Sequence, residues 1–139
     1  MTTTAFKTIK LTLAAIAIGA TTLATPAFAG GSFSFSYAPG DSEQAQVLGL
    51  GLSVLSIVNG MKGSGGNIKQ NGSGNAAGIA QNGFGNHGVI MQEGNGHEGT
   101  IEQNGNANSC GLFQFGRNTN ASCLQNGNGQ SSATMVFGW

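Results

Sequence analysis

The side chains that could do chemistry in this chain are mostly carboxamides, and they are regularly spaced. Between residues 67 and 138 a glutamine recurs every eleven residues without a slip. Stacked amides can hydrogen-bond to one another along a column of strands. The spacing therefore predicts an amide ladder, in which side chains bond up and down a stack. The six glutamines in this frame are Gln70, Gln81, Gln92, Gln103, Gln114 and Gln125.

The two cysteines, Cys110 and Cys123, fall in the same frame. If the chain folds back about a turn at 115 to 118, they lie directly across the core from each other. We predict a disulfide, because an exported chain with two cysteines usually oxidises them. Facing sheets sit about 10 Å apart and bridged Cα atoms need roughly 4.4 to 6.8 Å, so the coil must be narrow there. The alternative is a pair of buried free thiols.

Other chemistry has little support in the residues. His87, His97 and Glu98 suggest a metal site, but strand alternation places His97 inward and His87 outward. Calcium-binding solenoids need an aspartate in every turn, and the only aspartate, Asp41, lies outside the repeats. No Ser/His/Asp or Cys/His arrangement is supported, and the glycines lack the residues that complete a phosphate-binding loop. We therefore expect that the chain is not an enzyme and that it binds neither a cofactor nor a metal.

Each eleven-residue unit is predicted to form one strand and one turn. The residue two before each glutamine shares its face of the strand, and the glycine two after it begins a tight turn. Because a turn follows every strand, consecutive strands fold back face to face and every second strand stacks in register. The predicted fold is all-β, an amyloid-like two-sheet β-solenoid with 22 residues per coil. The residues preceding the glutamines are Ile68, Ile79, Ile90, Ile101, Leu112 and Cys123, and the turn glycines are Gly72, Gly83, Gly94, Gly105, Gly116 and Gly127.

The predicted fold-back also pairs large residues with small ones across the core. Leu112 faces Ala121, as Ile68 faces Ala77, and such pairing lets two sheets interdigitate without voids. Across the core, each glutamine faces another polar residue, most often an asparagine. We assign these asparagines, Asn75, Asn86 and Asn108, to the same core ladder.

The chain opens with the pattern of a secretory signal. Lys7 and Lys10 precede an apolar run from 11 to 23, and a small-x-small pattern ends at Ala29. We expect cleavage there and export of the remaining chain. No apolar run is long enough for a spanning helix. Near-zero net charge argues against nucleic acid as a partner, since that needs a basic patch.

Residues 30 to 66 lie outside the repeat frame. Phe33, Phe35 and Tyr37 alternate with serines, as in a half-buried strand. The apolar stretch 47 to 58 fits either a strand or a helix. We interpret 30 to 66 as a cap on an open end of the solenoid; the alternative is a segment that an export machine or a partner subunit recognises.

The outer faces of the predicted coil favour assembly. Strands 22 residues apart lie in the same sheet, so several large apolar side chains line up on the outer face of one sheet. A contiguous exposed apolar patch usually marks an interaction site, unless residues 30 to 66 cover it. Neither proline nor charge protects the edge at 130 to 139, so we also expect an open end that templates the next chain. The candidate interface comprises Met91, Phe113, Phe115, Met135, Phe137 and Trp139.

The units resemble the halves of the curlin repeat. Ile68-x-Gln70-x-Gly72-x-Gly74-Asn75-x-Ala77 carries the spacing, and the resemblance covers roughly residues 67 to 136. It implies a subunit of curli-type extracellular amyloid at the bacterial cell surface, acting in adhesion and biofilm matrix. Its implied partners are copies of itself, other curlin-like subunits and outer-membrane export machinery. A minor nucleator, or a non-polymerising surface adhesin or anchor on the same solenoid, remains an alternative.

Overall fold

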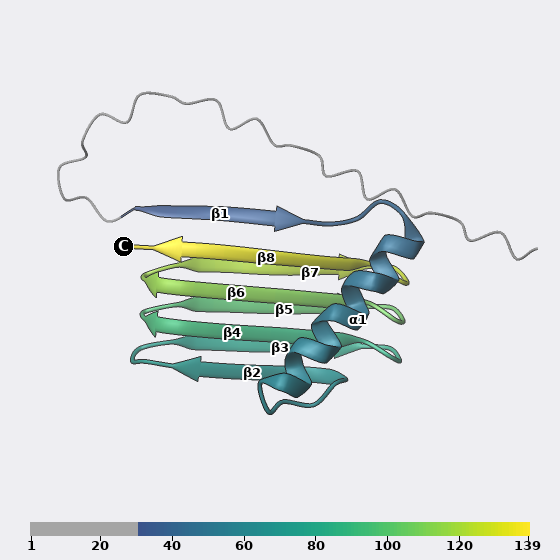
Figure 1. Ribbon diagram of the computed structural model, residues 1–139, viewed down its shortest axis with the longest axis horizontal. Coiled ribbons are helices and arrows are strands. Elements are labelled where there is room, and N and C mark those ends of the chain that lie inside the picture. Colours follow the sequence, from purple (N-terminus) through teal and green to yellow (C-terminus); the bar gives the residue numbers. More distant parts are fainter. Residues whose placement is uncertain (1–30) are drawn as a thin grey trace, which may run out of the picture.

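The computed structural model describes residues 31 to 139, so the expected signal segment lies outside the described residues. Seven of the strands form a stack, and one helix and one further strand precede them (Figure 1). In chain order the elements are β1 (Ser32–Tyr37), α1 (Ser42–Val58), β2 (Gly65–Asn71), β3 (Ala76–Asn82), β4 (His87–Asn95), β5 (Glu98–Asn104), β6 (Ser109–Arg117), β7 (Asn120–Asn126) and β8 (Ser131–Gly138).

The stacked strands alternate between two sheets. Sheet A has five strands in the order β1-β8-β6-β4-β2, and sheet B has three in the order β3-β5-β7. Within each sheet the strands from β2 to β8 run parallel and pair with partners 22 residues away, as Gln92 does with Gln114. The predicted two-sheet β-solenoid is therefore confirmed. Its first strand begins at Gly65, two residues before the predicted start.

The turns explain why glycine recurs in the frame. Gly105 has a φ of 119°, a region that only glycine enters readily. A Cβ there would also collide with the carbonyl oxygen of Gly127, one coil further along the stack. Turns on the same side of the stack are thus packed backbone against backbone. Two residues after this position a second positive φ is needed, and Ala107 adopts it with a φ of 56°.

The core between the sheets is narrow and mostly aliphatic at its centre. Ile90, Ile101 and Leu112 are fully or almost fully buried, and small side chains such as Ala77 and Ala121 pack against them. Cys110 and Cys123 lie across the core at disulfide distance, with their Cα atoms 6.8 Å apart. The predicted pairing and the narrowing that it requires are both present.

The apolar stretch 47 to 58 is helical and belongs to α1. Asp41 caps the helix, because its side chain accepts a hydrogen bond from the backbone N–H of Glu43 at 2.9 Å. Leu52 and Ser56, one helical turn apart, are buried against sheet A. Figure 1 shows α1 running across the outer face of that sheet, along the direction of stacking. Helical spacing therefore selects the side chains that meet the sheet.

The segment before α1 covers the C-terminal edge of sheet A. β1 pairs with β8 in antiparallel orientation, from Ser32 opposite Gly138 to Tyr37 opposite Ala133. Only β1 within residues 30 to 66 covers this edge, and the interpretation of the whole segment as a cap stays a prediction. The expectation that 130 to 139 form an open edge is wrong for this sheet, because β1 takes up the hydrogen bonds that the edge would offer.

Candidate assembly interface

Two columns of glutamine amides run through the core and define the chemistry of both ends. Nε2 of Gln70 donates to Oε1 of Gln92, which donates to Gln114, each at 2.8 Å. In the other column Gln81, Gln103 and Gln125 repeat the pattern at 2.7 Å. Every bond points toward the C-terminal end of the stack. The ladders therefore begin with acceptor oxygens and end with donor nitrogens.

The asparagines that the sequence assigns to the core ladder bond to the backbone of the next coil and make no amide-to-amide ladder. Oδ1 of Asn86 accepts the backbone N–H of Asn108 at 3.0 Å, and Nδ2 of Asn108 donates to the carbonyl oxygen of Gly127 at 2.7 Å. Asn75 makes the same acceptor contact with the backbone N–H of His97. These side chains tie each turn to the next coil, so their role is to hold the register.

Within residues 31 to 139, no further strand pairs with the end formed by β2 and β3. Both are edge strands. Ile68 shares the core-facing side of the sheet with Ile90, yet its side chain is 44% exposed. Among the described residues, none donates a hydrogen bond to Oε1 of Gln70 or of Gln81. An uncovered edge with free backbone groups and a free amide column is a template for another strand.

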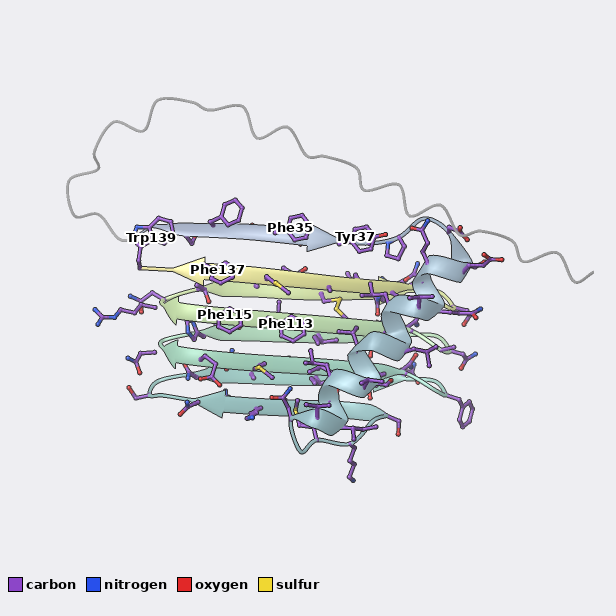
Figure 2. The ribbon with its side chains drawn as sticks, in the orientation of Figure 1. Phe35, Tyr37, Phe113, Phe115, Phe137 and Trp139 are labelled. Atoms are coloured by element: carbon purple, nitrogen blue, oxygen red, sulfur yellow. A yellow bond between two sulfur atoms is a disulfide. The ribbon has the colours of Figure 1, made fainter. Side chains whose placement is uncertain are left out.

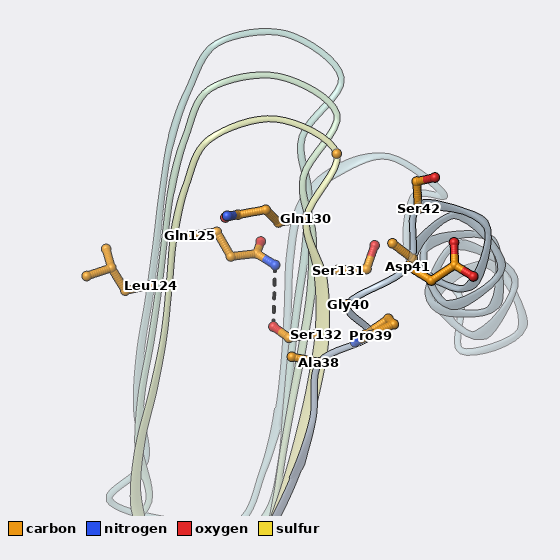
Figure 3. A pocket seen from close by; sticks show the side chains of 12 residues that line it. Ala38, Pro39, Gly40, Asp41, Ser42, Leu124, Gln125, Gln130, Ser131 and Ser132 are labelled. Carbon is orange, nitrogen blue, oxygen red and sulfur yellow. Dashed lines mark hydrogen bonds between the residues drawn. The ribbon is translucent and has the colours of Figure 1, made fainter.

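The end near the C-terminus is uneven, because sheet A extends further than sheet B. β7 is the last strand of sheet B, whereas β8 and β1 continue sheet A. An open cavity of about 510 Å³ lies at this step, lined by the end of β7, the turn after it and the loop between β1 and α1 (Figure 3). There Nε2 of Gln125 reaches Oγ of Ser132 at 3.4 Å, a longer bond than those within the ladders.

Sheet A ends differently from sheet B in its side chains. Val136 stands above Gln114 in the column, so this ladder stops one strand before the C-terminus. Nε2 of Gln114 keeps the bond to a backbone oxygen, here that of Glu98, that other ladder glutamines also make. In place of the ladder bond it donates to the oxygens of Thr119. All six residues of β1 are exposed, and the side-chain bond across the pair joins Ser36 to Thr134 at 2.7 Å.

The candidate apolar interface divides into a covered part and an exposed part. Phe113 is only 5% exposed, because α1 lays Leu52 over it and Val89. Phe115 and Phe137 stack with ring centroids 5.2 Å apart. Met91 and Phe115 are half-buried. The exposed members are Met135, Phe137 and Trp139.

The sequence did not predict that β1 would enlarge this exposed patch. Phe33 pairs with Phe137 and Phe35 with Met135, so the aromatic rings of β1 share the outer face of sheet A (Figure 2). The alternation of aromatic residues with serines in 33 to 37 was the available signal. Their partner strand lies about a hundred residues away, however, and no local pattern specifies it.

The outward side of α1 is a second exposed apolar surface. Val47, Leu50, Val54, Ile57 and Val58 are each at least 60% exposed. In the part of the chain that the structure describes, no helix is long and apolar enough to cross a membrane.

The histidines take structural positions. His97 is buried in the core, where Nδ1 lies 2.8 Å from Oγ1 of Thr119. His87 lies under α1, with Nε2 3.2 Å from Oγ of Ser56. Between residues 31 and 139 no group of three or more histidine, cysteine or acidic side chains is placed to hold a metal ion.

What the described residues offer is backbone pairing and amide stacking at the two ends of the coil, together with apolar contact on the flank of sheet A. Comparison with protein-family models, curated proteins and solved structures found no match to this chain. The geometry of the ends therefore carries the functional argument.

Proposed function

We propose that this chain is a secreted structural subunit of curli-like amyloid fibres at the bacterial cell surface, acting in adhesion and biofilm matrix. The observation that carries the proposal is the open end at β2 and β3. Among the described residues, no strand pairs with the outer edges of β2 and β3. The two glutamine ladders begin there with Oε1 of Gln70 and Oε1 of Gln81, which accept no hydrogen bond from the described residues. Such an end exchanges water for protein hydrogen-bond partners when further strands stack on it.

Growth by end-to-end templating follows from the repeat. A strand of another copy carries the same Ile-x-Gln or equivalent spacing, so its inward side chains continue the existing columns. Each added layer extends the stack by about 4.8 Å and pairs all its backbone groups, as in cross-β assemblies. Copies of this chain and other curlin-like subunits are the partners that this geometry fits.

The proposed route to the surface is export through the periplasm with the help of outer-membrane machinery. The signal-like segment at 1 to 29 supports export. The cysteine pair at disulfide distance is typical of proteins in oxidising compartments.

A second candidate function is a minor nucleator or a surface anchor that does not polymerise by itself. The observation that favours it is the end of sheet A, where β1 covers β8 and Val136 interrupts the ladder. A chain with one open end and one partly covered end could start or terminate a fibre made of another subunit.

Dilution of residues 30 to 139 from denaturant tests these two functions. For the fibre subunit we expect thioflavin fluorescence to rise after a lag, seeds of preformed fibre to abolish the lag, and electron micrographs to show fibres. A stable β-rich monomer without fibres over days would reject self-polymerisation. Seeding of a major curlin by that monomer would then support the nucleator.

A further inference from the structure

The number of strands in the solenoid determines where the next copy must enter. Seven strands, β2 to β8, alternate between the sheets, beginning and ending in sheet A. The next strand in this order therefore belongs to sheet B above β7, and the one after it to sheet A above β8. The first of these positions is open, whereas β1 occupies the second.

We propose that the next copy enters with its β2 on the open edge of β7, and that its β3 then displaces β1 from β8. This inference rests on the proposed growth of fibres by end-to-end stacking. It makes β1 a detachable cap that holds the monomer in a form unable to extend at sheet A. Successive copies are then rotated by half a turn about the fibre axis.

The side chains of β2 fit the edge of β7 in register. Gln70 lies over Gln125, Ile68 over Cys123, and Gly66 over Ala121 when the glutamines are aligned. Oε1 of Gln70, which receives no bond from the described residues, then meets Nε2 of Gln125. That nitrogen now reaches Ser132 at 3.4 Å, and stacking replaces this contact with a ladder bond like those at 2.7 Å in the same column.

The next strand also fits the position that β1 holds. Aligned in the same frame, β3 lays Ile79 over Thr134 and Gln81 over Val136, so at this position the backbone pairing continues and the glutamine ladder does not. It runs parallel to β8, as all other strand pairs in the stack do. β1 runs antiparallel and turns Ser32, Ser34 and Ser36 toward the core side, so it buries little apolar surface.

β1 is held mainly by backbone pairing with β8, and it remains tethered when it leaves. None of its residues is buried. Residues 38 to 41 link it to α1, which is held separately by the packing of Leu52 on Val89 and Phe113. Displacement of β1 therefore exchanges one strand pairing for another and leaves the helix in place.

Cross-linking within fibres tests the entry position. Asn71, Asn82 and Asn126 are all exposed, and each directly follows a glutamine of the frame. Fibres grown from a mixture of Asn71→Cys and Asn126→Cys chains should form an intermolecular disulfide on oxidation, because β2 lies on β7. The matched mixture of Asn82→Cys and Asn126→Cys, which reports β3 on β7, should give at least tenfold less. The reverse preference, or none, would overturn the inference while leaving fibre growth intact.

A proline substitution tests the cap. Gly31 and Trp139 exchange both backbone hydrogen bonds, and in an antiparallel pair every second residue repeats this exchange, so Phe35 also donates to β8. Phe35→Pro removes that donor and should shorten the lag of fibre formation several-fold. Phe35→Ala loses the same ring and keeps the donor, so its lag should stay several-fold longer than that of Phe35→Pro.

The outcomes separate the inference from the proposed function. Equal lags for the two Phe35 variants would reject the cap even if fibres form. Fibres from Phe35→Pro alone would support the cap and reject spontaneous polymerisation of the wild type. Absence of fibres from both the wild type and Phe35→Pro would overturn the fibre proposal and this inference together.

Discussion

At the scale of single residues, the turns set the strictest limits on sequence. Each turn lies directly against the turn one coil away, so a side chain has no space between them. Gly105 and Gly127 have the same role in the repeat and similar backbone angles, with φ of 119° and 138°. They differ because the turn at Gly127 is the last on its side, where the nearest atom to an added Cβ is Nε2 of Gln130 at 3.3 Å.

We predict that Gly105→Ala destabilises the fold more than Gly127→Ala. Both substitutions strain the backbone, but only the first drives a Cβ into the carbonyl oxygen of the next turn. The additional loss of unfolding free energy should be about 1 to 3 kcal/mol, typical of overpacking. Urea denaturation of the two variants measures it. Equal losses would mean that backbone strain alone accounts for glycine at these turns.

Ala107 offers the opposite test. It adopts a φ of 56°, which costs a residue with a Cβ roughly 1 to 2 kcal/mol. Ala107→Gly should therefore raise the unfolding free energy by about 1 kcal/mol. Ala121→Gly, within β7, serves as the control and should lower the unfolding free energy, since glycine weakens a strand. A destabilised Ala107→Gly variant would contradict the assignment of strain to this residue.

The cysteine pair should contribute to stability through chain entropy. Cys110 and Cys123 are separated by 13 positions, and closing a loop of that size stabilises a fold by about 3 kcal/mol. We expect the double change to alanine to lower the unfolding free energy by about 2 to 3 kcal/mol. Thiol labelling of the unfolded, unreduced protein checks the premise, because two reactive thiols would show that no bridge forms.

At the scale of elements, α1 and β1 decide which parts of the solenoid are accessible. α1 converts Phe113 from a surface residue into part of a second small core, together with Leu52 and Val89. β1 closes one edge of sheet A and leaves the edge of β7 open. The candidate interface is therefore smaller on the side of α1 and larger on the side of β1 than the repeat alone predicts.

We predict that Leu52→Ala lowers the unfolding free energy by about 2 to 4 kcal/mol, because Leu52 is 4% exposed and its loss leaves a cavity over Phe113. The matched variant Val54→Ala, on the exposed side of the same helix, should change stability by less than about 0.5 kcal/mol. Thermal unfolding followed by circular dichroism compares them. Similar melting temperatures for the two variants would show that α1 contributes little to the fold.

At the scale of the whole molecule, the solenoid is a one-dimensional stack in which each coil contacts only its neighbours. Stability in such a stack is greatest where a coil has neighbours on both sides. β4, β5 and β6 have such neighbours, whereas β1 and β2 lie at the ends of sheet A.

We predict that amide hydrogen exchange of the monomer is slowest in β4 to β6 and fastest in β1, with β2 between them. The order follows because end strands open without disturbing the rest of the stack. Exchange measured by mass spectrometry on peptic fragments resolves these segments. Protection of β1 equal to that of β6 would contradict both the stacking argument and the detachable cap.

The sequence by itself determined the repeating part of this protein. An eleven-residue period specifies which residues stack on each other, because each glutamine, apolar residue and glycine meets an equivalent residue 22 positions away. The two sheets, the amide ladders and the pairing of Cys110 with Cys123 therefore follow from local spacing. The columns of outward residues, such as Met91 with Phe113, follow in the same way.

Only the tertiary structure decided what residues 31 to 64 do. The stretch 47 to 58 is apolar enough for either a strand or a helix. In the structure it is a helix, and its Leu52 packs on Val89 and Phe113. The pairing of β1 with β8 joins Ser36 to Thr134 across 98 positions. A strand edge accepts backbone hydrogen bonds from any extended segment, so side-chain pattern alone does not specify which edge β1 covers.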